Sequence, residues 1–489
     1  MPFLLTGGTG LATGVPDTRI PNVSKLPPGP FGLTPGIAYD AYTGDPVHRF
    51  YQMWQQLDCN PKNATRDNPT GCSHGLFPWV ASTISTGSNG QTPPNPVPDL
   101  EGARSMGFYN IAAGDAPYFK YLADNFSMSD NFHQSIEGGT GANHVALGTG
   151  DAVWYSDGKG NAIVPPALNT EDPDPAAGTN NYYTQDGYSG GTYSDCADEK
   201  APGVSAVTGF LDSMHVKSNC QRGHYYLLNN YAPGYFGDGT VNSDAFAVPP
   251  SSVRTIGDEL LDKNISWRYY GAHWNRYLQD PDYQNPLNIY CDICNPFQYA
   301  TSIMANADVR TSHLKDTLDL EADLANDFLP AVAFVKPDGV VDGHPASSKL
   351  DLFEGFTKKI IDAVQAHPDL WKETAIFVTF DEGGGYYDSG FISPIDFFGD
   401  GTRIPMMAVS PWTTGGHISH QYADHVSILK FIERNWRLPA ITNRSRDNLP
   451  DPVASRDNPW VPKNGPALDD LFDLFSFGHR DCDQSFDGG

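Results

Sequence analysis

Two adjacent carboxylates, Asp381 and Glu382, are the side chains of this chain best suited to bind a cation. They follow an apolar run over 374–380, which predicts a buried strand, and three glycines come directly after them. Carboxylates at the end of a buried strand are costly to desolvate unless they hold a cation or a proton. Glycines let backbone and ligand approach closely. The motif indicates half of a metal site, although an ordinary polar turn uses the same residue types.

A second motif lies upstream, where residues 137–144 read Glu-Gly-Gly-Thr-Gly-Ala-Asn-His. The glycines predict a turn that opens a helix, which places the Thr140 hydroxyl at the helix N-terminus. Free N–H groups and the helix dipole bind phosphoryl groups there, and a metal activates a weakly nucleophilic hydroxyl. Asn143 is expected to donate to a phosphate oxygen. The alternative is a glycine turn capped by Thr140; the missing Gly-Lys-Ser/Thr ending excludes a nucleotide P-loop.

Three histidines and one lysine complete the set of candidate site residues. A strand predicted over 329–335 leads to Lys336 and then to His344, which we expect to bind phosphate or to protonate a leaving group. Lys336, His48 and His425 are expected to bind the substrate. Most of the fourteen histidines are expected to be ordinary surface or core residues.

The elements that must position these residues form an α/β pattern. Apolar runs predict strands over 329–335, 374–380 and 404–409, and apolar side chains over 352–364 fall on one helical face. A strand, a helix and a strand in this order predict a right-handed crossover between parallel strands. Ligands collect at the carboxyl ends of parallel strands, so the polar residues after these strands are expected to share one rim.

The remaining pattern predicts one domain over 1–489. It comprises an extended arm over 1–40, a loop-rich insertion over 156–205 and a C-terminal tail over 440–489. Shorter helices are expected over 45–57 and 118–126. Asp424 is the expected N-cap of a further helix, whose apolar residues recur at helical spacing from Ile428 to Trp436.

Composition bounds the class of protein. The chain has 489 residues, 39% of them hydrophobic, with 49 glycines and 40 prolines, which is typical of a globular, loop-rich protein. The formal charge of −27 argues against a general nucleic-acid binder, and also against attachment to anionic lipid by charge alone. No apolar run approaches the roughly 20 residues of a membrane span. The first residues lack the features of a signal peptide.

The seven cysteines suggest local cross-links. Cys59 with Cys72, and Cys196 with Cys220, each bracket a short loop, as local disulfides do. The pair Cys291 and Cys294 could be a zinc half-site, a redox pair or a further disulfide. No second Cys-x-x-Cys motif accompanies it, which disfavours a zinc ribbon.

Four blocks of the sequence resemble a known family, the bacterial phosphoesterases that include phospholipase C and related acid phosphatases, within the wider alkaline-phosphatase-like fold. The blocks are Asp-Asn-Phe-His-Gln-Ser with Gly-Gly-Thr-Gly-Ala-Asn-His in 130–144, Val-Lys-Pro with His-Pro in 335–345, Thr-Phe-Asp-Glu-Gly-Gly-Gly-Tyr-Tyr-Asp in 379–388, and Arg-Ile-Pro, Val-Ser-Pro and Asp-His-Val-Ser in 403–433. The pair formed by Asp-Glu-Gly-Gly and Asp-His-x-Ser is fairly specific.

The resemblance implies a fold and an activity. The fold would be α/β, alkaline-phosphatase-like, with a largely parallel central sheet, helices on both faces and long loop insertions. The activity would be metal-dependent hydrolysis of phosphoric esters, of acid phosphatase or phospholipase C type, through a phospho-threonine intermediate. The substrate would be a small phosphate ester or a phospholipid head group. A periplasmic or secreted location would follow, while the oligomeric state stays open.

The resemblance also implies roles for particular residues. Thr140 matches the nucleophile, and Asn143 matches an asparagine that holds phosphate. Asp381, Glu382 and the Thr140 hydroxyl match ligands of a divalent metal ion, whose identity stays open. His344 matches a histidine near the phosphate, and His48 matches another in a less certain region.

One departure from the family concerns its first strand. That strand typically ends in a Glu-Asn motif whose side chains complete the metal site, and no Glu-Asn dipeptide occurs here. The sequence is therefore expected to be truncated at its N-terminus. A catalytically inactive binding protein on the same fold is the alternative function. A sulfatase would carry a Cys/Ser-x-Pro-x-Arg motif, which is absent.

Overall fold

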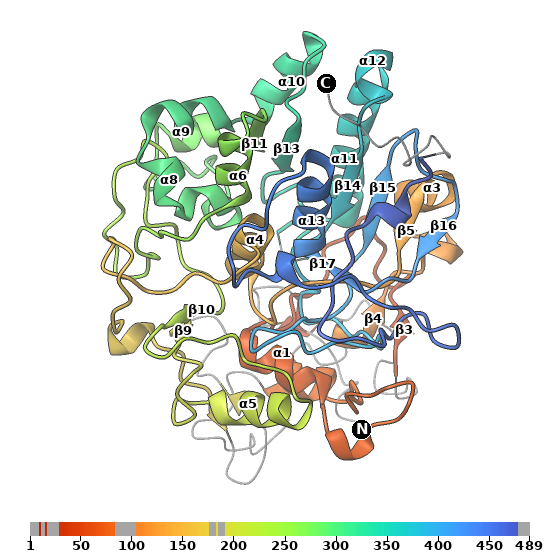
Figure 1. Ribbon diagram of the computed structural model, residues 1–489. Helices are drawn as coiled ribbons and strands as arrows, with labels where there is room; N and C mark the ends of the chain where they lie inside the picture. The colour runs from red at the N-terminus through yellow and green to blue at the C-terminus, as the bar shows by residue number, and fades with distance from the viewer. Residues whose placement is uncertain are drawn as a thin grey trace, which may run out of the picture.

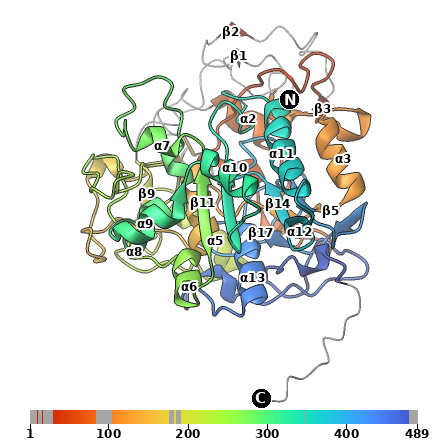
Figure 2. The same ribbon diagram turned by 90° about the horizontal axis from the view of Figure 1, so that it is seen from above.

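Two β-sheets form the centre of the fold, with helices packed against them (Figures 1 and 2). One sheet is parallel and has the order β12 (Leu314–Lys315), β11 (Trp267–Gly271) and β13 (Val332–Lys336). The other is mixed and has the order β14 (Ile376–Thr379), β15 (Met406–Val409), β5 (Ser127–Ser129) and β16 (His417–Ser419). The computed structural model describes residues 9–10, 15–16, 29–83, 104–175, 182–183, 191–345 and 347–477.

The expected crossover between parallel strands is wrong, although the α/β class is confirmed. Helix α11 (Leu350–Gln365) joins β13 to β14 as predicted, but β14 pairs antiparallel with β15, whereas β13 pairs parallel with β11. Val335 of β13 and Ile376 of β14 both pack in the apolar cluster around α11. Hydrophobic periodicity predicts this contact with the helix, but it carries no information about which backbone edges pair.

Helix α13 (His425–Trp436) begins as predicted at an Asp424 N-cap. The Asp424 carboxylate accepts from Val426 N at 2.7 Å and from Ser427 N at 3.3 Å, and the Ser427 hydroxyl accepts from Asp424 N at 3.1 Å. This reciprocal pair satisfies backbone donors that the first turn leaves open. Val426 and Leu429 are fully buried in the largest apolar cluster, which anchors the helix against the sheets.

Two other helices lie next to residues of the predicted site. Helix α4 (Thr140–Thr149) packs against α13, and helix α1 (Phe50–Leu57) begins five residues later than the predicted range of 45–57. Residues 45–48 are consequently an extended segment rather than a helical turn. The expected helix over 118–126 is confirmed as α3 (Pro117–Asn125).

The remaining elements surround these. The helices are α2 (Phe77–Thr83), α5 (Val204–Ser213), α6 (Ile256–Asp262), α7 (Trp274–Tyr277), α8 (Thr301–Met304), α9 (Ala307–His313), α10 (Thr317–Ala325) and α12 (Pro368–Trp371). Short strand pairs include β6 (Phe132–His133) with β17 (Ala423–Asp424), β3 (Phe31–Gly32) with β4 (Gly107–Phe108), and β9 (Tyr193–Ser194) with β10 (Tyr226–Leu227). The division into arm, insertion and tail stays a prediction, because much of it falls outside the described residues.

All six cysteines in the described part of the chain form disulfides, namely Cys59–Cys72, Cys196–Cys220 and Cys291–Cys294. The two predicted local cross-links are therefore confirmed, and the Cys-x-x-Cys pair is also oxidised. The seventh cysteine, at position 482, lies outside the described residues. A disulfide occupies both sulfurs of the Cys291 pair, so in this structure the pair is not a zinc half-site.

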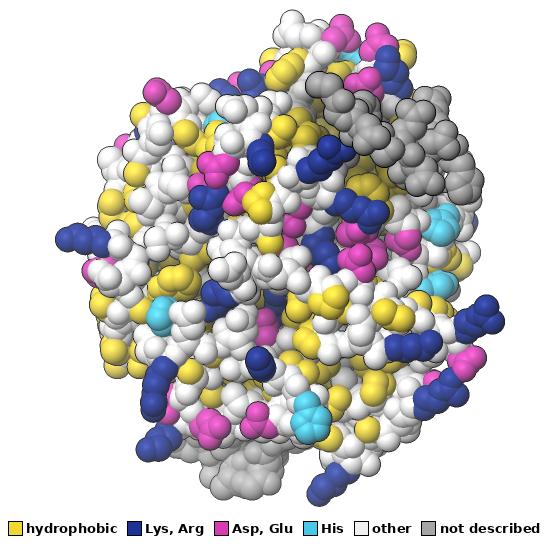
Figure 3. All heavy atoms as spheres, in the orientation of Figure 1, with side chains coloured by type: hydrophobic (Ala, Val, Ile, Leu, Met, Phe, Trp, Pro, Cys, Tyr) yellow, Lys and Arg dark blue, Asp and Glu magenta, His cyan; other side chains and the backbone are white. Residues whose placement is uncertain are grey.

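The surface carries both signs of charge. Figure 3 shows acidic and basic side chains interspersed with apolar ones over the described part of the face in view. Across the described residues, no helix has the length and hydropathy required to pass through a lipid bilayer. The expectation that the protein binds no nucleic acid stays a prediction.

Candidate active site

The first residue of α4, Thr140, meets Glu382 across the site. Its hydroxyl donates to Glu382 Oε1 at 3.0 Å, while Glu382 Oε2 is buried and has no hydrogen-bond partner among the described residues. Burial and the neighbouring Asp381 carboxylate raise the pKa of Glu382 well above its usual value. The protonated form of Glu382 is therefore favoured more than that of an exposed glutamate. A cation could take the place of that proton.

Asp381 has the opposite electrostatic character. Although burial raises its pKa, the nearby His144, Lys336 and His425 outweigh burial and leave the pKa below its usual value. His144 Nδ1 lies 3.7 Å from Asp381 Oδ2 and also contacts the Thr140 carbonyl at 2.9 Å. Two carboxyl groups whose pKa values are shifted in opposite directions thus lie beside a hydroxyl. Together they form an oxygen donor set suited to a divalent cation.

The glycines after Glu382 allow close packing of protein on protein. A Cβ on Gly383 would lie 2.1 Å from the Thr402 hydroxyl, and one on Gly385, whose φ is +73°, would lie 2.3 Å from the Val47 carbonyl. Gly383 N also donates to Gln134 Oε1 at 2.8 Å. These contacts bring the extended segment around Val47 against the site. The prediction that the glycines serve close approach of the backbone is right, but what approaches is another part of the chain.

Asn143 braces the turn that leads into α4. Its amide nitrogen donates to the carbonyls of Ile136, Gly138 and Gly139 at 2.9–3.3 Å, and its oxygen accepts from Ile136 N at 2.9 Å. The residue is also buried. In this structure the amide hydrogens go to backbone carbonyls of the turn before Thr140, and the contact of Asn143 with a phosphate oxygen stays a prediction.

The N-terminus of α4 is also less open than expected. Gly141 N donates to the Asn230 side chain at 2.7 Å, and Ala142 N donates to the Asn229 carbonyl at 3.1 Å. The segment that carries these two asparagines crosses the start of the helix. The N–H groups of Gly141 and Ala142 are therefore occupied in this structure, and phosphoryl binding at the start of α4 stays a prediction.

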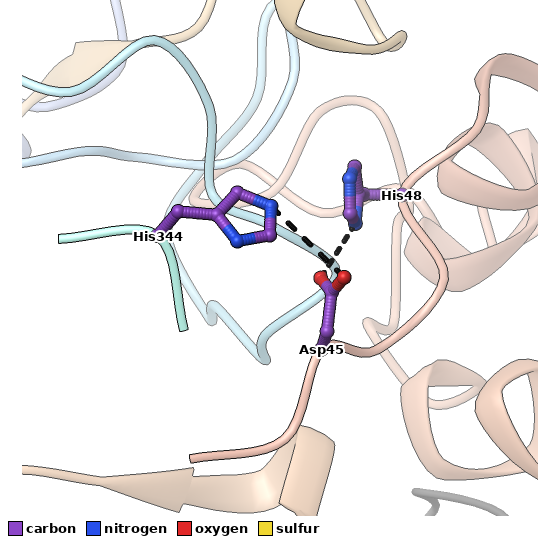
Figure 4. A group of neighbouring side chains, drawn as sticks. All are labelled: Asp45, His48 and His344. Atoms are coloured by element: carbon purple, nitrogen blue, oxygen red, sulfur yellow. Dashed lines mark ion pairs between the residues drawn. The ribbon is translucent and has the colours of Figure 1, made fainter. Parts of the chain in front are cut away.

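Asp45, His48 and His344 lie close to one another (Figure 4), and His48 also lies near Glu382. Asp45 Oδ1 lies 3.4 Å from His48 Nδ1, and Asp45 Oδ2 lies 4.0 Å from His344 Nε2. The other ring nitrogen of His48, Nε2, lies 3.7 Å from Glu382 Oε1. The structure therefore brings the predicted residues His48 and His344 together and places both near the carboxylate pair.

Lys336 and His425 differ in how they relate to the site. Lys336 Nζ pairs with Asp342 at 3.0 Å, and its charge lowers the pKa of Asp381. His425 is buried and contacts the Phe380 carbonyl through Nε2 at 2.9 Å, while its Nδ1 accepts from Ser135 N at 3.3 Å. Both ring nitrogens thus contact the backbone, one of them at the strand end before Asp381, and the substrate contact of His425 stays a prediction.

Three residues near the site are not among the candidates predicted from the sequence. His144 follows Thr140 by four positions, and this helical spacing could have indicated that the two lie on one face. Asp45 precedes His48 by three positions, which is a usable signal only once both are known to be functional. For Asn230, no local pattern indicates that it reaches the start of α4, because that contact spans 89 positions.

Comparison with known proteins places these residues in a wider group. A model described as the phosphoesterase family matches residues 30–439. Similar curated proteins include a hemolytic phospholipase C of Pseudomonas aeruginosa, 21% identical over 371 residues that make 68% of this chain and 40% of that protein. A probable acid phosphatase of Kluyveromyces lactis is 28% identical over 237 residues, covering 47% of this chain and 53% of that protein.

Other matches extend the same picture. Phospholipase C B of Mycobacterium tuberculosis is 27% identical over 215 residues, covering 38% of this chain and 40% of that protein. This chain thus spans about half, or less, of the length of these curated relatives. A solved protein of the alkaline phosphatase superfamily from Vibrio parahaemolyticus aligns with 9% identity and a TM-score of 0.31. The alignment covers 68% of this chain and 63% of that one.

Proposed function

The chain belongs to the phosphoesterase family, and from this premise we propose that it hydrolyses phosphoric esters through a phosphorylated Thr140. The observation that carries the proposal is the hydrogen bond of 3.0 Å from the Thr140 hydroxyl to Glu382, directly beside Asp381. A hydroxyl that donates to a carboxyl group whose side chain is only 6% exposed, with a second, partly exposed carboxyl group beside it, is poorly explained as a surface turn. It is well explained as a nucleophile beside a cation site.

A divalent metal ion fits the donor set formed by Thr140, Asp381 and Glu382. Glu382 Oε2 is a buried oxygen with no partner among the described residues, and the set consists of the oxygen donors that hard cations prefer. When bound, such an ion would lower the pKa of the hydroxyl and offset charge on the phosphoryl group. The choice among metals stays open.

The residues themselves perform the following steps. Glu382, in its carboxylate form, orients the Thr140 hydroxyl and accepts its proton, while the Thr140 oxygen forms a bond to phosphorus and the bond from phosphorus to the leaving oxygen breaks. The leaving oxygen takes up a proton, and His344, whose side chain is 38% exposed, is accessible for that transfer or for holding phosphate. Water then attacks the phospho-threonine and releases phosphate with the free hydroxyl.

Two substrate types are compatible with this chemistry. Among the relatives, some are named phospholipase C, which would act on a phosphodiester, and others acid phosphatase, which would act on a monoester. We propose a small soluble ester, since the net charge of −27 disfavours approach to anionic lipid. An aromatic cage for a choline group could be offered by the tyrosines over 182–193, but Tyr193 is fully buried and Tyr188 lies outside the described residues.

A catalytically inactive binding protein is the second candidate. It is favoured by the absence of a Glu-Asn dipeptide from the chain, since that motif would add two further metal ligands. The site as described has few donors, and a weakly held metal would leave Thr140 inactive. Binding of phosphate without turnover would support this alternative.

The cross-links bear on the proposed location of the protein. Three disulfides among the described residues are typical of a protein that matures in an oxidising compartment. They support the proposal of a periplasmic or secreted enzyme.

Substitution of Thr140 tests the proposed function. With p-nitrophenyl phosphate and p-nitrophenylphosphorylcholine as substrates, we expect Thr140→Ala to lower kcat by at least a thousandfold, and Thr140→Ser to retain measurable turnover. Mass spectrometry of acid-quenched protein should detect a phosphoryl group on the peptide containing Thr140. Thr311→Ala, in the exposed part of α9, is the matched control. Unchanged turnover in a folded Thr140→Ala protein would refute the assignment.

A further inference from the structure

The cluster formed by Asp45, His48 and His344 carries an inference of its own. Each residue offers one donor atom, and the three donor atoms lie within 4.8 Å of one another. Four ligands around a zinc ion, bound at about 2.0–2.1 Å, stand about 3.3 Å apart. The separation of 4.0 Å between Asp45 Oδ2 and His344 Nε2 is close to what a shared ion requires and too long for a hydrogen bond.

Two atoms of the cluster are buried and have no hydrogen-bond partner among the described residues. They are Asp45 Oδ1 and His344 Nδ1. A buried carboxylate oxygen without a donor is costly. Within the described part of the chain, the charged partners of Asp45 are the two histidines, and no lysine or arginine reaches it. A cation would satisfy the carboxylate.

His48 is oriented as a metal-binding histidine usually is. Its Nδ1 lies 2.7 Å from the Pro46 carbonyl, to which it can only donate, and this fixes Nε2 as the nitrogen with the lone pair. A hydrogen bond from the other nitrogen to a backbone carbonyl is the common way to orient such a ligand. Nε2 points towards Glu382 Oε1, 3.7 Å away.

The segments that carry these residues are tied to one another. Thr43 N donates to the Pro345 carbonyl at 3.3 Å, next to His344. The Tyr386 hydroxyl donates to the Gly44 carbonyl at 2.6 Å and so links the segment before Asp45 to the chain that follows Glu382. The three donors thus come from a braced arrangement and not from independent loops.

From this geometry we propose that Asp45, His48 and His344 form a second cation site that shares Glu382 with the site at Thr140 and Asp381. Two imidazoles and a carboxylate favour zinc or a similar borderline ion over magnesium or calcium. The exposed parts of Asp45 and His344, 24% and 38%, leave a side open to a phosphate oxygen. The inference rests on the proposed function, because Glu382 links the two donor sets.

The second site would change the task of His344. As a ligand, it would act on the phosphoryl group through the ion and would not carry the proton for the leaving group. Paired cations about 3.5–4 Å apart stabilise both the attacking and the leaving oxygen in many phosphoryl-transfer enzymes. The histidines and Asp45 would then bind the side of the substrate opposite Thr140.

Zinc stoichiometry tests the proposal. The full chain is stripped with a chelator and titrated with Zn²⁺, and bound metal is counted by inductively coupled plasma mass spectrometry after gel filtration. We expect two equivalents in the parent protein and one in Asp45→Asn and in His344→Gln, with at least tenfold weaker binding at the lost site. Co²⁺ in place of Zn²⁺ should show a tetrahedral visible absorption band that both variants lose.

Two further variants separate this proposal from the proposed function. Asp381→Asn should lose the other equivalent and keep the Co²⁺ band. His420→Gln, whose ring pairs with Asp130 at 2.8 Å elsewhere on the surface, should keep both, and circular dichroism checks folding in each variant. If the parent protein binds one equivalent of zinc, and Asp45→Asn and His344→Gln still bind it, the second site alone is overturned. If the parent protein binds one equivalent and Asp381→Asn still binds it, the metal placement at Thr140 alone is overturned. If the parent protein binds no zinc, both sites are overturned.

Discussion

At the scale of residues, the site depends on where buried charge is compensated. Burial and the neighbouring Asp381 raise the pKa of Glu382, whereas the pKa of Asp381, despite burial, is lowered by His144, Lys336 and His425. Two neighbouring carboxyl groups thus have pKa values shifted in opposite directions although their sequence context is nearly the same. The hydroxyl of Thr140 donates to the group whose pKa is raised, and a cation there would favour the charged form of that group.

Asn143 offers a prediction at this scale. Because its amide satisfies Ile136 N and three carbonyls in a buried turn, Asn143→Ala should destabilise the fold by about 2–4 kcal/mol as well as lower kcat. Urea unfolding followed by fluorescence measures the first effect. Asn326→Ala, in an exposed position with one amide bond, should cost well under 1 kcal/mol. A stable Asn143→Ala protein with only a raised KM would instead indicate direct phosphate contact.

At the scale of elements, helix α13 forms as predicted but carries a buried carboxyl group that lacks a full set of partners. Its N-terminus is capped by Asp424, and its apolar face is buried. Near its C-terminus, however, Glu433 is 7% exposed and its Oε1 has no partner among the described residues. Burial, followed by the nearby Asp447, raises the pKa of Glu433 to about 9. The helix therefore binds a proton more tightly than the unfolded chain does.

This difference predicts a pH dependence. A raised carboxyl pKa contributes stability that is full below the unfolded value of about 4.5 and is lost as pH rises towards 9. Glu433→Gln should remove that loss, so its gain in stability should be near zero at pH 5 and about 1–3 kcal/mol at pH 8. Urea midpoints at both pH values measure it. Glu373→Gln, in an exposed position, is the control, and an equal gain at both pH values would contradict the explanation.

At the scale of the whole molecule, disulfides tie loops to the body. Their sequence separations are 24 for Cys196–Cys220, 13 for Cys59–Cys72 and 3 for Cys291–Cys294. Closing a longer loop removes more entropy from the unfolded chain. Cys196 is buried in the same apolar cluster as α1, so this cross-link also holds the packing near the site.

Paired substitutions by alanine test the contribution of each cross-link. Removing Cys196–Cys220 should cost about 3 kcal/mol, and removing Cys291–Cys294 under about 2 kcal/mol, on the loop-closure argument. Thermal unfolding with matched reduced samples of the parent protein ranks the three. If the Cys291–Cys294 pair proved the most stabilising, loop entropy would not explain the contribution of these bonds. Local packing of that pair would then be the explanation.

The sequence by itself determined the local features of this protein. The Asp424 N-cap, the start of α4 at Thr140, the helix over 350–365 and the strand before Asp381 all follow from residue types a few positions apart. Such features depend on capping, glycine turns and apolar periodicity, whose energies are set within one or two turns of chain. The carboxylate pair and its hydroxyl partner were identifiable for the same reason.

Only the tertiary structure decided which of these parts meet. In the folded protein, β13 and β14 belong to different sheets. The amide of Asn143 and both ring nitrogens of His425 contact the backbone. Asp45 lies beside His344, about 300 positions away in the chain. Contacts of this kind arise from the packing of distant segments and from the requirement that every buried polar group finds a partner. No local pattern encodes that choice, because it is settled by the energy of the whole core.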